Sequence, residues 1–76
     1  MGEVRIPGLS AFEEDPVLTR WHVAVGDVVT EGQGIASVEL DKAEAIVVAQ
    51  ESGRIVRLLA DVGDHLMSGD VIAEIG

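Results

Sequence analysis

No cysteine occurs among the 76 residues of this chain. Disulfide bonds, thiolate metal ligands and cysteine nucleophiles are therefore excluded. Aromatic residues are nearly absent as well, with one tryptophan, one phenylalanine and no tyrosine, which leaves little for stacking on nucleic-acid bases. The sequence has no run approaching the roughly 20 apolar residues of a membrane span, and its first residues do not resemble a signal peptide.

Basic residues are also scarce. Lysine and arginine together number 5 against 14 aspartates and glutamates, which gives a formal net charge of −9. The basic residues form no cluster, so long-range repulsion disfavours binding to nucleic-acid phosphates or to anionic lipid. We therefore expect neither nucleic acid nor membrane among the partners, and an acidic surface of this kind favours solubility or docking to a basic partner.

The residues that are present predict one small all-β domain, spanning residues 1–76. Short apolar runs alternate with glycine, aspartate and proline, which is typical of short strands joined by tight turns. We expect strands at residues 4–6, 17–24, 28–29, 35–40, 45–49, 54–60, 66–67 and 71–75. Within 17–24, a period of two places Val17, Thr19, Trp21 and Val23 on the apolar face and Leu18 on the opposite, mostly polar face.

The two halves of the chain repeat each other with an offset of 37 residues. Val25-Gly26-Asp27 recurs as Val62-Gly63-Asp64, and Gly32 recurs as Gly69. Neither half could bury its apolar face alone, so we expect the two to pack face to face. The repeat thus predicts a small antiparallel sandwich or flattened barrel with approximate two-fold symmetry, in which Gly26 and Gly63 adopt turn conformations that are costly for other residues.

Lys42 is the only lysine, and it lies in the segment that joins the two repeats. Asp41, Lys42 and Ala43 are expected at the tip of a hairpin, where a modifying enzyme could reach them. In a two-fold arrangement this join lies at one end of the domain, and the chain termini tend towards the other. A single amine presented in this way predicts a protein that offers one lysine for covalent modification.

No metal site and no catalytic residues are predicted for the chain itself. Neither His22 nor His65 has a second histidine at ligand spacing, and no Ser-His-Asp set with a nucleophile elbow is present. Asp27 and Asp64 follow glycines at equivalent positions of the repeat. We expect their carboxylates to accept hydrogen bonds from backbone amides of the turns.

Over essentially its whole length, the chain resembles a lipoyl domain of the acyltransferase (E2) component of 2-oxo acid dehydrogenase complexes, in the biotinyl/lipoyl carrier family. The resemblance rests on these motifs: Trp21, Val25-Gly26-Asp27-Val28, Gly32, Glu39-Leu40-Asp41-Lys42-Ala43, Gly53, Val62-Gly63-Asp64, Gly69 and Ile72. It implies a flattened β-barrel or sandwich of two four-stranded antiparallel sheets with pseudo-two-fold symmetry. It also implies lipoate joined to Lys42 by an amide bond, with Asp41 and Ala43 as the flanking motif. Leu40 departs from the family, which usually has threonine or serine there.

The same resemblance implies a carrier domain that is not catalytic on its own and belongs to a dihydrolipoamide acyltransferase. Lipoate on Lys42 would shuttle acyl groups and electrons between three partners: the thiamine-diphosphate-dependent E1 decarboxylase, the E2 catalytic core and dihydrolipoyl dehydrogenase (E3). A lipoyl ligase or transferase would attach the group. The isolated domain is expected to be a monomer in the cytoplasm, or in the mitochondrial matrix of a eukaryote.

Recognition by these partners is expected in two places. The first is the loop of residues 9–16, with Phe12, Glu13 and Glu14, and Phe12 could equally anchor the core. The second is Glu39 and Leu40, just before the lysine.

Two other functions stay open. One is a biotinyl carrier domain of a carboxylase, against which the lack of methionines beside Lys42 counts. The other is an unmodified β-sandwich binding module in which Lys42 is incidental. The sequence does not specify which 2-oxo acid complex the domain would serve.

Overall fold

The protein is all-β throughout the part that the structure describes. The computed structural model describes residues 2–6, 15–40 and 43–76. The strands are β1 Gly2–Arg5, β2 Val17–Trp21, β3 Val28–Val29, β4 Gly34–Leu40, β5 Ala43–Val48, β6 Gly53–Leu58 and β7 Val71–Ile75. A search of these residues finds no helix that is long and apolar enough to cross a membrane.

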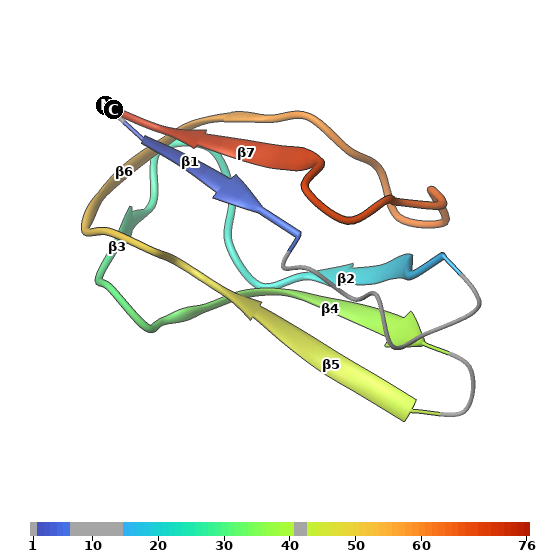
Figure 1. Ribbon diagram of the computed structural model, residues 1–76. Helices are drawn as coiled ribbons and strands as arrows, with labels where there is room; N and C mark the ends of the chain where they lie inside the picture. The colour runs from blue at the N-terminus through green and yellow to red at the C-terminus, as the bar shows by residue number, and fades with distance from the viewer. Residues whose placement is uncertain (1, 7–14, 41–42) are drawn as a thin grey trace.

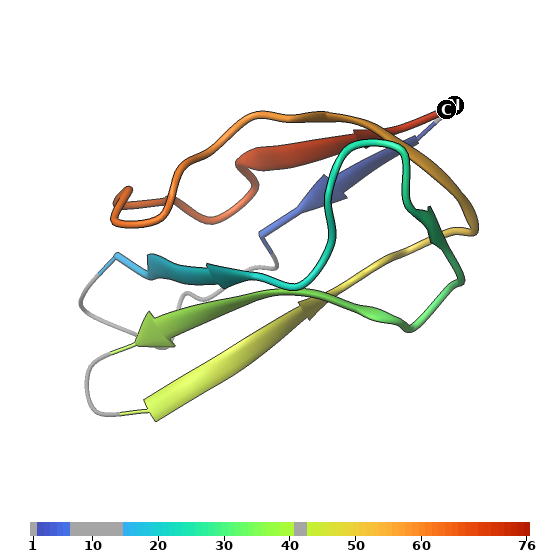
Figure 2. The same ribbon diagram turned by 180° about the vertical axis from the view of Figure 1, so that it is seen from behind.

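The strands form two antiparallel sheets that face each other. One sheet has the order β1-β7-β6-β3, and the other has the order β2-β4-β5. Both chain ends lie side by side, because Gly2 pairs with Ile75 across β1 and β7. The C-terminal end of β4 and the start of β5 lie at the opposite end of the molecule, whose longest dimension is 33 Å (Figures 1 and 2).

The predicted all-β sandwich of two antiparallel sheets is confirmed, and the described residues give four strands in one sheet and three in the other. The strand expected at 66–67 is reduced to a single bridge between Val17 and His65. Leu66 N donates a hydrogen bond to Pro16 O over 2.7 Å, but proline has no N–H to return one. The equivalent of Pro16 in the other half is Gly53, which keeps its N–H, and there β3 and β6 pair over two residues. One proline therefore explains why the second sheet has three described strands.

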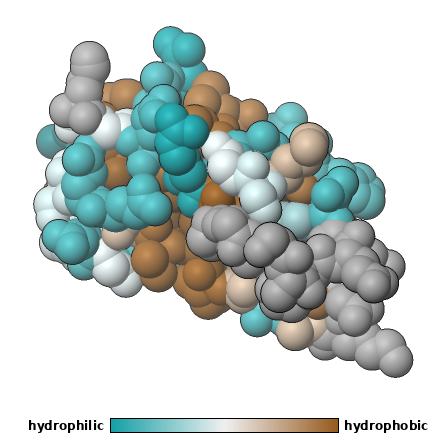
Figure 3. Space-filling view, in the orientation of Figure 1, coloured by the Kyte–Doolittle hydropathy of each residue, from teal (hydrophilic) through white to brown (hydrophobic). Residues whose placement is uncertain are grey.

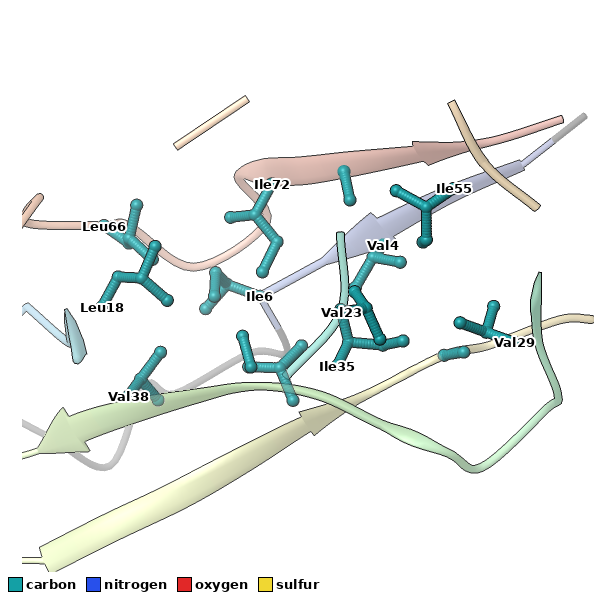
Figure 4. Packing of buried hydrophobic residues seen from close by; sticks show 14 of the residues in the cluster. Val4, Ile6, Leu18, Val23, Val29, Ile35, Val38, Ile55, Leu66 and Ile72 are labelled. Carbon is teal, nitrogen blue, oxygen red and sulfur yellow. The ribbon is translucent and has the colours of Figure 1, made fainter. Parts of the chain in front are cut away.

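The core lies between the two sheets and is shared by both halves. Ile35 and Val38 from β4 and Ile72 from β7 point into the space between the layers (Figure 4). Sixteen hydrophobic residues are buried there: Val4, Ile6, Leu18, Val23, Val29, Ile35, Ala36, Val38, Leu40, Val47, Ala49, Ile55, Leu66, Ile72, Ala73 and Ile75. Burial of one valine, leucine or isoleucine side chain contributes about 1.5–3 kcal/mol, so this shared core holds the two halves together.

A β-bulge in β2 corrects the predicted facing of that strand. Leu18, expected on the polar side, is fully buried. The register against β4 then shifts between Leu18 and Arg20, which restores Trp21 and Val23 to the core side. An extra residue at a bulge reverses the alternation of side chains, and a simple period of two misses that reversal.

The turn glycines confirm the internal repeat. Gly26 and Gly63 have φ angles of 98° and 97°, and Gly32 and Gly69 have φ angles of 87° and 86°. Positive φ of this size is rare for residues with a side chain. The φ angles of the equivalent glycines in the two halves therefore agree to within about a degree.

Aspartates close these turns, as the sequence predicts. Asp27 Oδ2 accepts a hydrogen bond from the backbone N–H of Ala24 over 2.9 Å. Asp64 Oδ2 accepts the equivalent bond from Asp61, also over 2.9 Å. Each carboxylate satisfies a backbone donor that the turn would otherwise leave to solvent.

Replacing Gly63 with valine should lower the free energy of unfolding by about 1–3 kcal/mol, because a β-branched residue is strained at positive φ. No atom lies within 4 Å of a Cβ added at Gly63 or at Gly26, so backbone strain is the only steric cost at either position. The matched variant Gly26→Val should therefore lose a similar amount. Urea unfolding followed by circular dichroism measures both, and unchanged midpoints would contradict the prediction.

Candidate functional site

The candidate site is at the end of the hairpin formed by β4 and β5. These strands pair from Gly34 with Val48 up to Leu40 with Ala43. Only two residues, Asp41 and Lys42, separate Leu40 from Ala43 in the sequence, and both lie outside the described residues. The structure thus fixes the two strand ends between which the single lysine is held.

The core anchors this end of the hairpin. Leu40 is 3% exposed, and Val38 and Val47 are also buried. Long-range packing of this kind holds the strand ends rigidly, which suits a site that must present one side chain in a defined place. Leu40, expected as a recognition residue, is therefore a core residue whose side chain a partner cannot contact in this structure.

Two carboxylates lie directly opposite each other beside the strand ends. Glu39 on β4 pairs with Glu44 on β5, and both side chains are exposed. Like charges at directly opposed positions of an antiparallel pair destabilise the sheet. Glu39 was predicted as a recognition residue, and the structure places it at the surface, beside Ala43, which is exposed and begins β5.

The remaining predicted recognition residues, Phe12, Glu13 and Glu14, lie outside the described residues. The prediction that Phe12 is either a recognition residue or a core anchor therefore stays a prediction.

Sequence reasoning missed Glu44 and a pocket on the outer face of the same sheet. The pocket has a volume of about 250 Å³ and is lined by Thr19, Arg20, His22, Ser37, Glu44 and Ile46. Ser37 Oγ and His22 Nε2 are 2.7 Å apart, and Thr19 Oγ1 donates to Ser37 O over 3.1 Å. The signal that could have indicated it is a break in the repeat, because Ser37 and His22 replace the Glu74 and Leu59 of the other half.

The described residues hold no group of three or more histidine, aspartate or glutamate side chains that could bind a metal ion. In the sequence, one lysine lies between the two strand ends, which carry the exposed Glu39 and Glu44. A primary amine can form an amide with the carboxyl group of a cofactor, and lipoate and biotin both carry such a carboxyl group. The fold and the site together are those of a carrier domain.

Comparison with known proteins gives the family. The family described as "Biotin-requiring enzyme", the biotin/lipoyl family, matches residues 2–75, and the chain belongs to it. Its members carry lipoate or biotin on a lysine.

One curated relative and two solved structures illustrate the similarity. The chain is 37% identical over 76 residues to the dihydrolipoyllysine-residue succinyltransferase component of the 2-oxoglutarate dehydrogenase complex of Staphylococcus saprophyticus, covering all of this chain and 18% of that protein. It is 26% identical to the lipoyl domain of the 2-oxoglutarate dehydrogenase complex of Azotobacter vinelandii, with a TM-score of 0.72, covering 96% of this chain and 95% of that one. It is 29% identical to the urea carboxylase of Kluyveromyces lactis, with a TM-score of 0.81, covering 99% of this chain and 6% of that one.

Replacing Glu44 with glutamine should stabilise the domain by about 0.2–1 kcal/mol, because it removes the repulsion from Glu39 across the strand pair. Urea unfolding at low ionic strength measures the change, and added salt should shrink it. Glu31→Gln is the matched control, since Glu31 is an exposed turn residue. A surface change of this kind should stay within about 0.5 kcal/mol of zero. Equal effects of the two substitutions would show that the Glu39–Glu44 pair is not repulsive.

Proposed function

We propose that this chain is a lipoyl carrier domain of the acyltransferase component of a 2-oxo acid dehydrogenase complex, with lipoate attached to Lys42. The single observation that carries the proposal is the pairing of Leu40 with Ala43 at the hairpin end remote from the chain termini, because the only lysine of the sequence lies between these two residues in the chain. Matches to E2 components that cover the whole chain support it, although the chain spans about 18% of the length of the first of those relatives.

The chain's own residues hold and present the lysine. Leu40 and its core neighbours fix the strand ends, while the exposed Ala43 leaves the approach to the amine free of bulk. Glu39 and Glu44 give this end a negative charge that attracts a basic surface on a partner. When bound, lipoate would supply a disulfide that takes up an acyl group and two electrons.

Tethering explains why a domain without catalytic residues is useful here. A covalent arm keeps its cargo at an effective concentration of roughly millimolar at each partner within reach. The chain termini lie at the opposite end from the β4–β5 hairpin, so a connection to other domains would not obstruct the arm (Figure 1). By this proposal the partners are the E1 decarboxylase, the E2 catalytic core, E3 and a lipoyl ligase.

A biotinyl carrier is the second candidate, and the backbone similarity to a urea carboxylase favours it. The residues beside the lysine favour lipoate, because Asp41 and Ala43 stand in the two flanking positions instead of methionines. The two candidates differ in the mass added to one lysine, so one measurement separates them.

The test is the intact mass of the protein after incubation with lipoate, ATP and a lipoyl ligase, and separately with biotin, ATP and a biotin ligase. We expect a lipoyl-sized gain, no biotin-sized gain, and no gain in Lys42→Arg, which removes the only lysine. Native electrophoresis should show one additional negative charge on the modified protein. A biotin-sized gain would replace the proposal with the second candidate, and no gain from either ligase would refute both.

A further inference from the structure

The two outer faces of the sandwich carry equivalent rows of residues with different charges. On the three-stranded sheet, Arg20, Ser37 and Ile46 pair in a row across β2, β4 and β5. On the four-stranded sheet, Arg57, Glu74 and Glu3 pair in the equivalent row across β6, β7 and β1. The repeat thus supplies an internal control for the first row.

The row on the four-stranded sheet is neutralised by its own side chains. Arg57 Nε lies 3.3 Å from Glu74 Oε1, and Glu3 Oε1 lies 2.6 Å from Arg5 Nη2. A pocket of about 340 Å³ beside this row is lined by Gly2, Glu3, Val56, Glu74, Ile75 and Gly76, so its charged groups are carboxylates. Among the described residues, both arginines at this row, Arg57 and Arg5, are thus paired with carboxylates.

The row on the three-stranded sheet has lost both carboxylates. Ser37 stands where Glu74 stands, and Ile46 stands where Glu3 stands. Among the described residues, Arg20 consequently has neither an ion pair nor a side-chain hydrogen bond. Arg20 lines the 250 Å³ pocket together with Ser37 and His22.

These groups select a single carboxylate. A guanidinium binds a carboxylate through two parallel hydrogen bonds, and a hydroxyl and an imidazole can add further ones. Glu44 lines the same pocket, so a doubly charged phosphate would meet about twice the repulsion that a monoanion meets. Ile46, 51% exposed, gives the pocket an apolar side. Figure 3 shows hydrophobic side chains in the middle of the lower edge of the molecule, along which β5 runs in Figure 1. An aliphatic chain that ends in one carboxylate fits this combination.

The pocket is also close to the lysine along β5. Ile46 lies three residues beyond Ala43, which is about 10 Å in a strand. A lipoyl-lysine side chain contains roughly a dozen bonds of about 1.5 Å and is longer than this span. Glu44 and Ile46 share one face of β5, so the pocket opens on the outer side of the hairpin that bears Lys42.

We propose that this pocket binds the terminal carboxylate of an acyl group carried on the Lys42 arm, which selects a succinyl-type cargo over a cargo without a second carboxylate. The inference rests on the proposed function and deepens it, because it names the class of acyl group. A weak site is sufficient, since the tether supplies its ligand at roughly millimolar concentration. Binding would hold the cargo against the domain between partners.

The first test does not depend on the lipoyl group. Monomethyl succinate, which has one carboxylate, is titrated into the ¹⁵N-labelled unmodified domain, with inorganic phosphate as the comparison. We expect ¹H–¹⁵N shifts at Arg20, Ser37 and Ile46 in the millimolar range with monomethyl succinate, and much smaller ones with phosphate. Arg20→Gln should weaken binding at least fivefold, whereas the matched variant Arg57→Gln should leave it unchanged.

A second variant gives the three-stranded sheet the charge pair that the four-stranded sheet has. Ser37→Glu places a carboxylate opposite Arg20, as Glu74 is placed opposite Arg57, and should abolish the shifts by neutralising the guanidinium. A circular dichroism spectrum and a dispersed amide spectrum check that this variant folds, because Ser37 is only 3% exposed.

The second test uses the lipoylated domain. After reduction, the arm thiol attacks succinic anhydride to give a thioester with a free carboxylate, and acetic anhydride gives the acetyl control. We expect shifts at Arg20 and Ser37 in the succinyl-loaded domain that the acetyl-loaded domain lacks, and their loss in Arg20→Gln. Because Lys42 is the only lysine and is already amidated, the chain terminus is the one competing amine.

Identical spectra of the two loaded domains at Arg20 and Ser37 would overturn the inference while leaving the lipoyl carrier function intact. Equal responses to phosphate and monomethyl succinate would overturn the carboxylate selectivity. Should the mass measurement reveal no lipoylation, the proposed function fails, and the titration of the unmodified domain still decides whether the pocket binds a carboxylate. Unchanged binding of monomethyl succinate in Arg20→Gln would overturn the inferred carboxylate site, whether or not Lys42 is lipoylated.

Discussion

Reciprocal backbone hydrogen bonds between the two repeats hold this domain together. Gly26 N donates to Ile55 O over 2.7 Å, and Ile55 N donates to Asp27 O over 2.9 Å. The equivalent pair of bonds joins the other turn to β2: Gly63 N donates to Leu18 O over 2.7 Å, and Leu18 N donates to Asp64 O over 3.0 Å. Each half thus supplies the turn that pairs with a core strand of the other, so neither half can fold without its copy.

This interlocking also determines where the functional end of the molecule lies. Strands β4, β5 and β7 run along the length of the sandwich, and the chain termini and the β4–β5 hairpin lie at opposite ends of it (Figures 1 and 2). One end holds the chain termini, while the other holds the paired residues Leu40 and Ala43. A β-sheet scaffold with no helix in its described part therefore holds the two strand ends that flank the lysine in the sequence far from the chain termini.

The two halves of the domain differ structurally and chemically at the positions where the repeat is broken. Pro16, which has no N–H, stands at the position equivalent to Gly53 and reduces one strand to a bridge. Ser37 stands at the position equivalent to Glu74, so Arg20 has no counter-ion among the described residues. The two halves therefore differ on one scaffold, because Pro16 alters the backbone pairing of one sheet and Ser37 alters the charge on its outer face. Chemical differences between the two halves of a repeated fold arise at the positions where their residues differ.

Much of the fold followed from local patterns in the sequence. The turn conformation of a glycine depends on only a few neighbouring residues, and Gly26 and Gly63 have the positive φ that the repeat predicted. Gly32 and Gly69 have positive φ as well. The bulge between Leu18 and Arg20 was not predictable in this way, because packing against β4 and the core decides which side of the strand receives the extra residue. Leu40 was likewise predicted as a recognition residue because it lies near the lysine in the sequence, but the fold buries its side chain in the core.

The sequence by itself determined the two-fold repeat, the turns and the single lysine between the halves, since each is a property of residue order. Only the tertiary structure decided that Arg20, Ser37 and Ile46, which lie on three different strands, form one row beside a pocket. The reason is strand register: a shift of one residue moves a side chain to the other face of a sheet, and register is set by the packing of the whole core.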